Sequence, residues 1–183
     1  MLTNTTYGTW LPGDPRGSVT RVRDHRPSDP QIKTRLRHNQ VGEEFEPSRP
    51  ALQLHAANQL RGTPVRLTKA HADILIAQFQ ETCDYRNWNL HAVAVMWNHV
   101  HLVVDLREEC PDKGLADLKA YGSRAFNNTF GKLASGRWWT EKGSTRFLKD
   151  EEALHAAMDY VLHRQPNPLA IWPTTSIAEN SGR

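Results

Sequence analysis

The stretch MWNHVHLVVDL, residues 96–106, places two histidines at the start of an otherwise apolar segment. Apolar residues at alternate positions, several of them β-branched, predict a strand over residues 99–106. Successive side chains of a strand point to opposite faces of the sheet, so every second residue belongs to the core face. The side chains predicted on that face are those of Val100, Leu102, Val104 and Leu106.

His99 and His101 are predicted to share the opposite face of this strand, with their Cα atoms roughly 6.6 Å apart. Two imidazoles that project in parallel can bind one divalent cation, provided that another element supplies a third ligand. The same tripeptide pattern also occurs on ordinary solvated strands. The spacing alone therefore leaves a metal site and a solvated pair both open.

Further strands are predicted on both sides of this segment. Residues 1–11 are rich in threonine and aromatic residues, and the turn sequence Pro-Gly-Asp-Pro follows them directly. Residues 90–97 alternate in polarity and are predicted to form a hairpin with the strand that follows Asn98. Residues 137–148 are predicted to be extended and carry several aromatic side chains.

Helical periodicity is present in three segments, where apolar residues recur at steps of three and four. Thr68 and Asp150 are the predicted N-caps of the first and third helix. Pro166 is predicted to end the third helix, because the residue before a proline is driven out of the helical region. The predicted helices cover residues 68–87, 114–130 and 150–165.

The order of these elements predicts the fold class. A strand, an insertion, a helix, two strands, a helix, a strand and a helix follow one another, which is the order of a split βαβ unit. We expect an α+β fold, a ferredoxin-like antiparallel sheet with an extra C-terminal helix that carries Tyr160. Residues 1–183 are expected to form one domain, with an irregular basic insertion at about 12–66 that is either a binding segment or a surface loop.

Composition limits the class of protein. The chain has 183 residues, and 23 Lys and Arg against 20 Asp and Glu give a net charge of +3, a weak bias toward anionic partners. Cys83 and Cys110 lack metal-ligand spacing and do not predict a disulfide framework. No stretch approaches the roughly 20 apolar residues of a spanning helix, and no secretory signal is recognisable. We expect a cytoplasmic protein that does not bind membranes.

Four tyrosines are candidates for chemistry beside the histidines. Tyr121 lies on the apolar stripe of its predicted helix, which favours a role in core packing. Tyr160 lies at the edge of the stripe of the third helix, one turn before its polar end. That position suits a catalytic tyrosine and equally suits a rim tyrosine with its hydroxyl in water.

Four stretches, in this order and spacing, resemble one family: TYGTWLPGDPRGSV, MWNHVHLVV, LKAYGSRAFN, and WWTEKGSTRFLKDEEALHAAMDYVL running into QPNP. The chain resembles the HUH-type single-tyrosine transposases, which include the REP-associated tyrosine transposases and are named for two histidines around a hydrophobic residue. The resemblance implies a dimeric, ferredoxin-like enzyme that cuts and rejoins single-stranded or hairpin DNA with Mg²⁺ or Mn²⁺. It also implies that His99 and His101 bind the metal and that Tyr160 forms a 5′-phosphotyrosine intermediate.

The third metal ligand departs from the family pattern. Such proteins commonly have Asn or Gln four residues after the tyrosine, whereas this chain has Arg164 there and Gln165 at the next position. On a regular helix Gln165 would point about 140° away from Tyr160, but Pro166 directly after it allows its amide to swing toward the histidines. His163 is the rival, although Mg²⁺ prefers oxygen ligands. The resemblance therefore predicts Gln165, with His163 as the alternative.

Residues 114–149 carry a one-sided positive charge that only Asp117 and Glu141 oppose. This bias fits contacts to phosphates, although each basic residue by itself is compatible with a solvated surface. Of the neighbours Trp138 and Trp139, one is expected in the core, because neighbours in a strand face opposite sides. The other is expected to stack on unpaired bases or on a hairpin end. The residues predicted to contact DNA are Lys119, Arg124, Arg137, Trp138, Lys142, Arg146 and Lys149.

Three functions are compatible with these residues. The first is an active single-strand DNA endonuclease and transposase, working as a homodimer. The second is a host-retained, catalytically weak protein that binds DNA hairpins, which Arg164 in the usual ligand position favours. The third is a metal-dependent hydrolase that uses water in place of Tyr160.

Overall fold

The computed structural model describes residues 1–18, 23–24, 36–37 and 48–174. The chain divides into two compact units, one of Met1–Tyr7 with Val65–Arg183 and the other of Gly8–Pro64. The second unit contains the helix α1 (Pro50–Asn58) and a two-stranded ladder of β2 (Arg23–Asp24) and β3 (Leu36–Arg37). A single domain with an insertion at about 12–66 stays a prediction.

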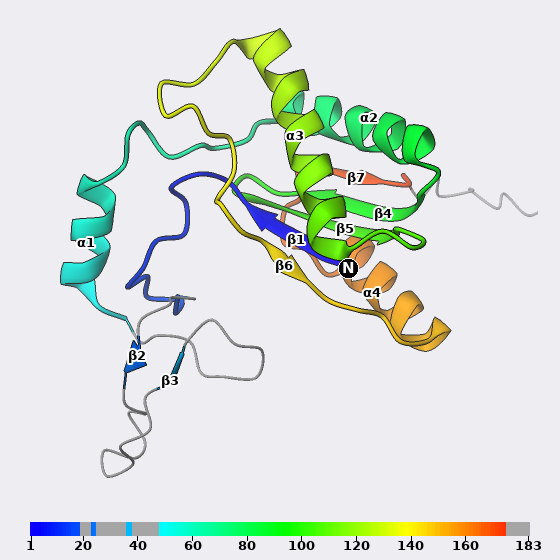
Figure 1. The fold of residues 1–183 in the computed structure, drawn as a ribbon, viewed down its shortest axis with the longest axis horizontal. Helices are drawn as coiled ribbons and strands as arrows, with labels where there is room; N and C mark the ends of the chain where they lie inside the picture. Colours follow the sequence, from blue (N-terminus) through cyan, green and yellow to red (C-terminus); the bar gives the residue numbers. More distant parts are fainter. Residues whose placement is uncertain (19–22, 25–35, 38–47, 175–183) are drawn as a thin grey trace, which may run out of the picture. The chain divides into compact units, whose positions relative to one another are not determined.

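The first unit is built on a five-stranded antiparallel sheet in the order β6-β1-β5-β4-β7 (Figure 1). Its first four strands have the order expected of a split βαβ unit, so the predicted α+β fold is confirmed. Strand β7 was not predicted and adds to the free edge of β4. The strands are β1 (Leu2–Thr5), β4 (Asn89–Val95), β5 (His99–Asp105), β6 (Ser144–Thr145) and β7 (Ala170–Trp172).

The predicted hairpin is present as β4 and β5, joined by Met96, Trp97 and Asn98, of which Trp97 and Asn98 form the tip of the turn. The turn closes through the Met96 amide, which donates to the His99 carbonyl at 2.8 Å. This pairing fixes the register of β5 and therefore the face on which each of its side chains lies.

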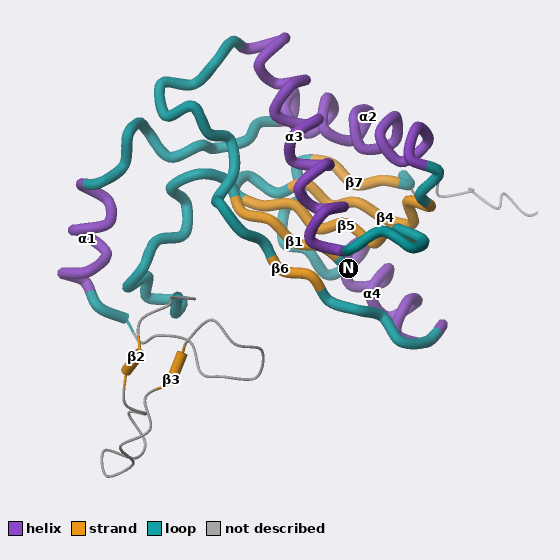
Figure 2. Tube along the Cα trace, in the orientation of Figure 1, coloured by secondary structure: helices purple, strands orange, loops and turns teal. Residues whose placement is uncertain are grey.

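Three helices cover the sheet on its two faces. Helices α2 (Lys69–Arg86) and α3 (Pro111–Phe130) lie on one face, and α4 (Glu151–His163) lies on the other, as Figure 2 shows. Helix α3 begins three residues earlier than predicted, because a proline is well suited to the first turn of a helix. Within the described part of the chain, no helix is long and apolar enough to cross a bilayer.

The helix ends follow the predicted capping. Thr68 caps α2 in a reciprocal arrangement with His71, and Asn87 ends that helix in the left-handed region at φ 55°. The Asp150 carboxylate accepts a hydrogen bond from the Ala153 amide at 2.8 Å and so begins α4.

Two hydrophobic cores lie on the two faces of the sheet. Val100 and Leu102 of β5 belong to the core under α2 and α3, as predicted, and Val103 belongs to the core under α4. The first core contains the largest fully buried side chains, among them Leu75, Phe79, Leu102, Leu118 and Phe126. The second consists of Ala92, Ala94, Met96, Val103, Ala157 and Val161.

Two predicted strands are shorter in the structure than in the sequence analysis. The first ends at Thr5, after which Thr6 forms only an isolated bridge to Trp139. The extended stretch 137–148 contributes only β6 to the sheet. A regular alternation of side chains therefore does not apply to this stretch.

Candidate functional site

His99 and His101 lie at the start of β5, on the face of the sheet that α4 covers. Their ring centroids are 4.8 Å apart with an angle of 80° between the ring planes. The strand alternation therefore brings the two imidazoles together on one face, next to Val103 of the small core.

Strand β1 supplies a partner for His101. Thr3 is the register partner of His101, and its hydroxyl oxygen lies 2.8 Å from Nδ1 of the imidazole. Only 8% of the surface of His101 is exposed. Burial, and secondly the neighbouring His99, lower the pKa of His101 to about 4. At neutral pH this imidazole is uncharged, as a metal ligand must be.

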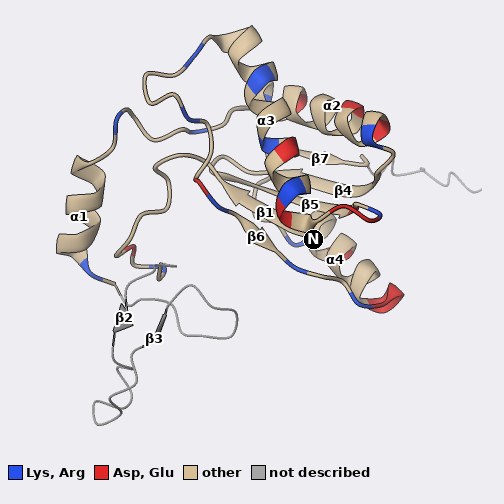
Figure 3. Ribbon diagram, in the orientation of Figure 1, with Lys and Arg blue, Asp and Glu red and all other residues tan. Residues whose placement is uncertain are grey.

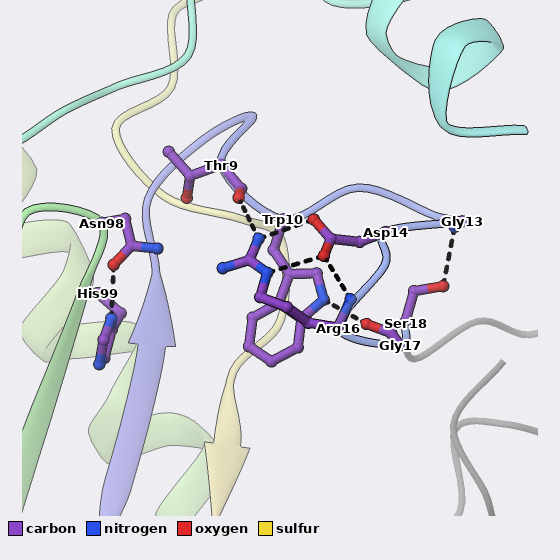
Figure 4. Close-up of polar contacts among 9 residues, drawn as sticks. All are labelled: Thr9, Trp10, Gly13, Asp14, Arg16, Gly17, Ser18, Asn98 and His99. Carbon is purple, nitrogen blue, oxygen red and sulfur yellow. Dashed lines mark hydrogen bonds and ion pairs between the residues drawn. The ribbon is translucent and has the colours of Figure 1, made fainter. Parts of the chain in front are cut away.

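The turn supplies a partner for His99. Its Nδ1 lies 2.7 Å from the side-chain oxygen of Asn98, drawn in Figure 4. An amide oxygen can only accept, so Nδ1 of His99 carries the proton of this hydrogen bond. Asn98 is itself buried, and its backbone carbonyl accepts hydrogen bonds from the amide and the hydroxyl of Thr6.

Tyr160 lies in the last turn of α4 and reaches the same place. The neighbouring residues Ala157 and Val161 pack against the sheet and fix the helix there. The centroid of the Tyr160 ring is 5.7 Å from that of His101, with an edge-to-face angle of 72°. The Tyr160 side chain is 42% exposed and therefore accessible from solvent.

The other tyrosines lie elsewhere. Tyr7 packs against the core under α2 and α3, and Tyr85 is 80% exposed on α2. Tyr121 is half-buried on α3, where the Arg124 guanidinium lies 5.1 Å from its ring centroid. Among the aromatic contacts of the described residues, only Tyr160 brings a phenol to the paired histidines.

The residues after Tyr160 adopt defined interactions. Gln165 donates its side-chain amide to the Tyr160 carbonyl at 3.1 Å, so its side chain folds back onto the end of α4. Arg164 pairs with the Asp159 carboxylate at 2.7 Å, and His163 is exposed. The described residues contain no group of three His, Cys, Asp or Glu suited to a metal ion. The third ligand, Gln165 or His163, stays a prediction.

The two histidines fit a divalent cation as a donor pair. Metal-binding imidazoles usually engage their second nitrogen with a protein group, which fixes the tautomer and the ring orientation. His99 and His101 both do so at Nδ1, with Asn98 and Thr3. Two such ligands leave coordination positions for oxygen atoms from water or phosphate.

Two of the residues predicted to contact DNA have other partners in the structure. The Lys119 ammonium donates to the carbonyls of Thr140 at 2.7 Å and Glu141 at 2.9 Å. Its pKa is lowered, because the effect of burial exceeds the opposite effect of the neighbouring Glu141. Lys119 therefore holds the loop before β6 on α3. Two of its three donors are engaged in this way, and a contact of Lys119 with DNA stays a prediction.

The expectation for the tryptophan pair was wrong. Trp138 and Trp139 are both buried, with exposed fractions of 5% and 6%, because the chain around them is not a regular strand. The Trp138 indole donates to the Asn127 side chain at 2.9 Å, and the Trp139 indole donates to the Lys119 carbonyl at 3.2 Å. In this structure Trp138 cannot stack on a base.

Basic residues follow one another along the chain from α3 through β6 to the start of α4 (Figure 3). The remaining predicted DNA contacts are all exposed. They are Arg124, Arg137, Lys142, Arg146 and Lys149.

Sequence reasoning missed the two residues that orient the histidines. Asn98 directly precedes His99, and this adjacency was a usable signal. Thr3 is 98 positions from His101, and only the pairing of β1 with β5 brings them together.

One comparison with known proteins found a match. Residues 52–161 match a family model described as "Transposase IS200 like". The matched segment is more than half of the chain and includes both histidines and Tyr160. No match was found among curated proteins or among solved structures.

Proposed function

The chain belongs to the IS200-like transposase family, and we propose that it cuts and rejoins single-stranded or hairpin DNA through Tyr160. Family membership makes DNA its partner and transposition its process. The observation that carries the proposal is the contact between the rings of Tyr160 and His101, with the His99 ring beside that of His101. A nucleophile and a metal-binding pair must lie together if both act on one phosphate.

The family generally uses divalent metal ions. We propose that His99 and His101 hold Mg²⁺ or Mn²⁺ with Gln165 as the third ligand, or His163 as the alternative. The cation would supply Lewis-acid stabilisation of the charge that grows on the scissile phosphate. Thr3 and Asn98 contribute by fixing the orientation of the two rings, and the Asn98 side-chain oxygen, which can only accept, also places a proton on Nδ1 of His99.

Tyr160 is the proposed nucleophile. Its hydroxyl oxygen attacks phosphorus, the bond from phosphorus to the 3′ oxygen breaks, and the phenol proton ends on the departing 3′ oxygen. The products are a 5′-phosphotyrosine and a free 3′-hydroxyl. Because one phosphodiester replaces another, attack by a new 3′-hydroxyl reverses the step and rejoins DNA without an external energy source. The exposure of Tyr160 supports access by a DNA strand.

The exposed basic residues of α3 and of the chain between α3 and α4 are the proposed contacts to the DNA backbone. Each of them would neutralise one phosphate, which makes binding salt-dependent. They are Arg124, Arg137, Lys142, Arg146 and Lys149. The tyrosine meets His101 of its own chain, which supports a site complete within one copy of a proposed homodimer.

The test is trapping of the covalent intermediate. The full chain is incubated with Mn²⁺ or Mg²⁺ and hairpin-bearing, 3′-labelled oligonucleotides, and protein-linked label is measured after denaturation. We expect an adduct that Tyr160→Phe abolishes and that the control Tyr85→Phe retains, because Tyr85 is exposed on another helix. An undiminished adduct in Tyr160→Phe would refute the assignment. In the same assay, loss of the adduct in Gln165→Ala but not in His163→Ala identifies Gln165 as the third ligand, and the reverse result identifies His163.

A second function is favoured by one observation. Arg164, in the position where the family commonly has a metal ligand, is paired with Asp159. This pairing fits a host-retained protein that binds DNA hairpins with weakened catalysis. Tight hairpin binding without cleavage in any divalent metal would support it. Cleavage that persists in Tyr160→Phe, with no protein-linked DNA in the parent, would instead indicate a hydrolase that uses water.

A further inference from the structure

The turn between β4 and β5 is anchored on both of its tip residues. The Trp97 carbonyl accepts a hydrogen bond from the Leu67 amide at 2.7 Å. The Asn98 carbonyl accepts one from the Thr6 amide at 2.8 Å. With both peptide groups held by neighbouring segments, the backbone of the turn is fixed, and the direction of its side chains is fixed with it.

The two side chains of the turn point to different surroundings. Asn98 is buried against His99, whereas Trp97 is 42% exposed. The Arg66 guanidinium lies 4.8 Å from the centroid of the Trp97 ring. Arg66 is held there because Val65 and Leu67 on either side of it are buried, which directs its own side chain outward.

The position of Trp97 relative to the site follows from the chain. Trp97 is two residues before His99, so the two Cα atoms are at most about 7 Å apart. The Trp97 ring is therefore an exposed aromatic surface at the tip of the turn that leads into His99, with the Arg66 guanidinium beside it. Trp138 and Trp139, the tryptophans of the basic segment, are by contrast buried.

We propose that Trp97, steadied by Arg66, stacks on one unpaired base of the DNA strand whose scissile phosphate reaches Tyr160. This inference rests on the proposed function, and it assigns a base-contacting residue to that site. Unpaired bases offer a free aromatic face, whereas bases within a duplex are stacked on one another. Stacking on an aromatic side chain is tolerant of base sequence. Trp97 would therefore favour single-stranded over double-stranded DNA and would hold the strand in one position.

The experiment separates contacts to bases from contacts to the backbone. Binding is measured by fluorescence anisotropy in the full-length Tyr160→Phe variant, so that no cleavage interferes. The two probes are an oligothymidylate of about 12 nucleotides and a fully abasic deoxyribose-phosphate strand of the same length. We expect Trp97→Ala to weaken oligothymidylate binding roughly 5- to 150-fold and to leave binding of the abasic strand unchanged.

Two further variants control for structure. Trp97→Phe is expected to recover most of the affinity, since it keeps an aromatic face, and Tyr85→Ala is expected to change neither probe because Tyr85 lies exposed on α2. Equal weakening of both probes by Trp97→Ala would overturn the proposal, because it would indicate a disturbed turn. Unchanged binding of both probes, or a parent that binds them equally, would also overturn it.

The outcome is distinguishable from a failure of the proposed function. If the covalent adduct persists in Tyr160→Phe while Trp97→Ala weakens binding of oligothymidylate but not of the abasic strand, the tyrosine assignment fails and the stacking site stands. If Tyr160→Phe abolishes the adduct while Trp97→Ala leaves oligothymidylate binding intact, the stacking site fails and the nuclease assignment stands.

Discussion

The two faces of the central sheet are covered very differently. Helices α2 and α3, of 18 and 20 residues, cover one face over a core of large side chains. Helix α4, of 13 residues, covers the other over a core of mainly small ones. The proposed site lies where the short helix ends, with Tyr160 in its last turn. Because α4 covers only part of its face of the sheet, the polar residues His99, His101 and Tyr160 lie together at the end of that helix, whereas the opposite face is fully covered.

One strand serves both faces. In β5, Val100 and Leu102 enter the large core, whereas His99 and His101 lie on the face of α4. The closed face gives the strand a fixed register, and the register determines where the imidazoles point. Stability and chemistry therefore depend on the same seven residues in alternation, and a substitution on one face can be compared with a substitution on the other.

The largest expected effect tests the closed face. Phe126 is fully buried, with its ring centroid 4.5 Å from that of Trp138. We expect Phe126→Ala to lower the free energy of unfolding by about 3–5 kcal/mol. Val161→Ala, on the face of α4 that packs on the sheet, removes two carbon atoms from the smaller core and should lower the free energy of unfolding by about 2 kcal/mol. Urea denaturation measures both, and an equal loss would contradict the comparison between the two faces.

The next expected effect is the pH dependence of stability, which tests the burial of His101 on the face that α4 covers. The pKa of His101 is lowered to about 4 in the folded chain and returns to its ordinary value of 6.5 on unfolding. Between pH 6.5 and 4 the unfolded state therefore binds more protons, and the folded state loses stability as the pH falls. Urea denaturation without metal is measured at pH 6.5 and at pH 4. Between these values the free energy of unfolding of the parent should fall by on the order of 3 kcal/mol more than that of His101→Gln. Parallel pH profiles would show that His101 is not buried as a neutral ring.

The smallest effect tests the hydrogen bond that orients His101. Thr3→Val keeps the shape of the side chain but removes the hydroxyl next to Nδ1. Loss of such a supporting group typically weakens metal binding 10- to 100-fold. Calorimetric titration with Mn²⁺ should detect this loss, with Thr129→Val on the exposed side of α3 as the matched control. An unchanged Mn²⁺ affinity would mean that Thr3 does not support a metal ligand.

Much of the fold was predictable because its signals are local. Thr68, Asn87 and Asp150 mark helix ends through their own backbone and capping chemistry. The pairing of β4 with β5 followed from two alternating segments separated by a short turn. The three-residue strand β7 has too few residues for a recognisable period, and it was missed.

The candidate site was predictable only in part. His99 and His101 were identifiable together because strand alternation is a local rule. The burial of Trp138 was mispredicted and the hydrogen bonds of Lys119 were not foreseen, because the stretch after α3 is irregular and its contacts depend on where it crosses α3. The exposure of Trp97 likewise depends on the segments that anchor its turn.

The sequence by itself determined the helices, the hairpin and the shared face of the two histidines, since periodicity and capping act over a few residues. Only the tertiary structure decided that the Tyr160 ring lies 5.7 Å from His101 and that Thr3 contacts that imidazole from β1. These contacts join residues 59 and 98 positions apart, because packing of α4 on the sheet and pairing of β1 with β5 close loops that no local pattern encodes.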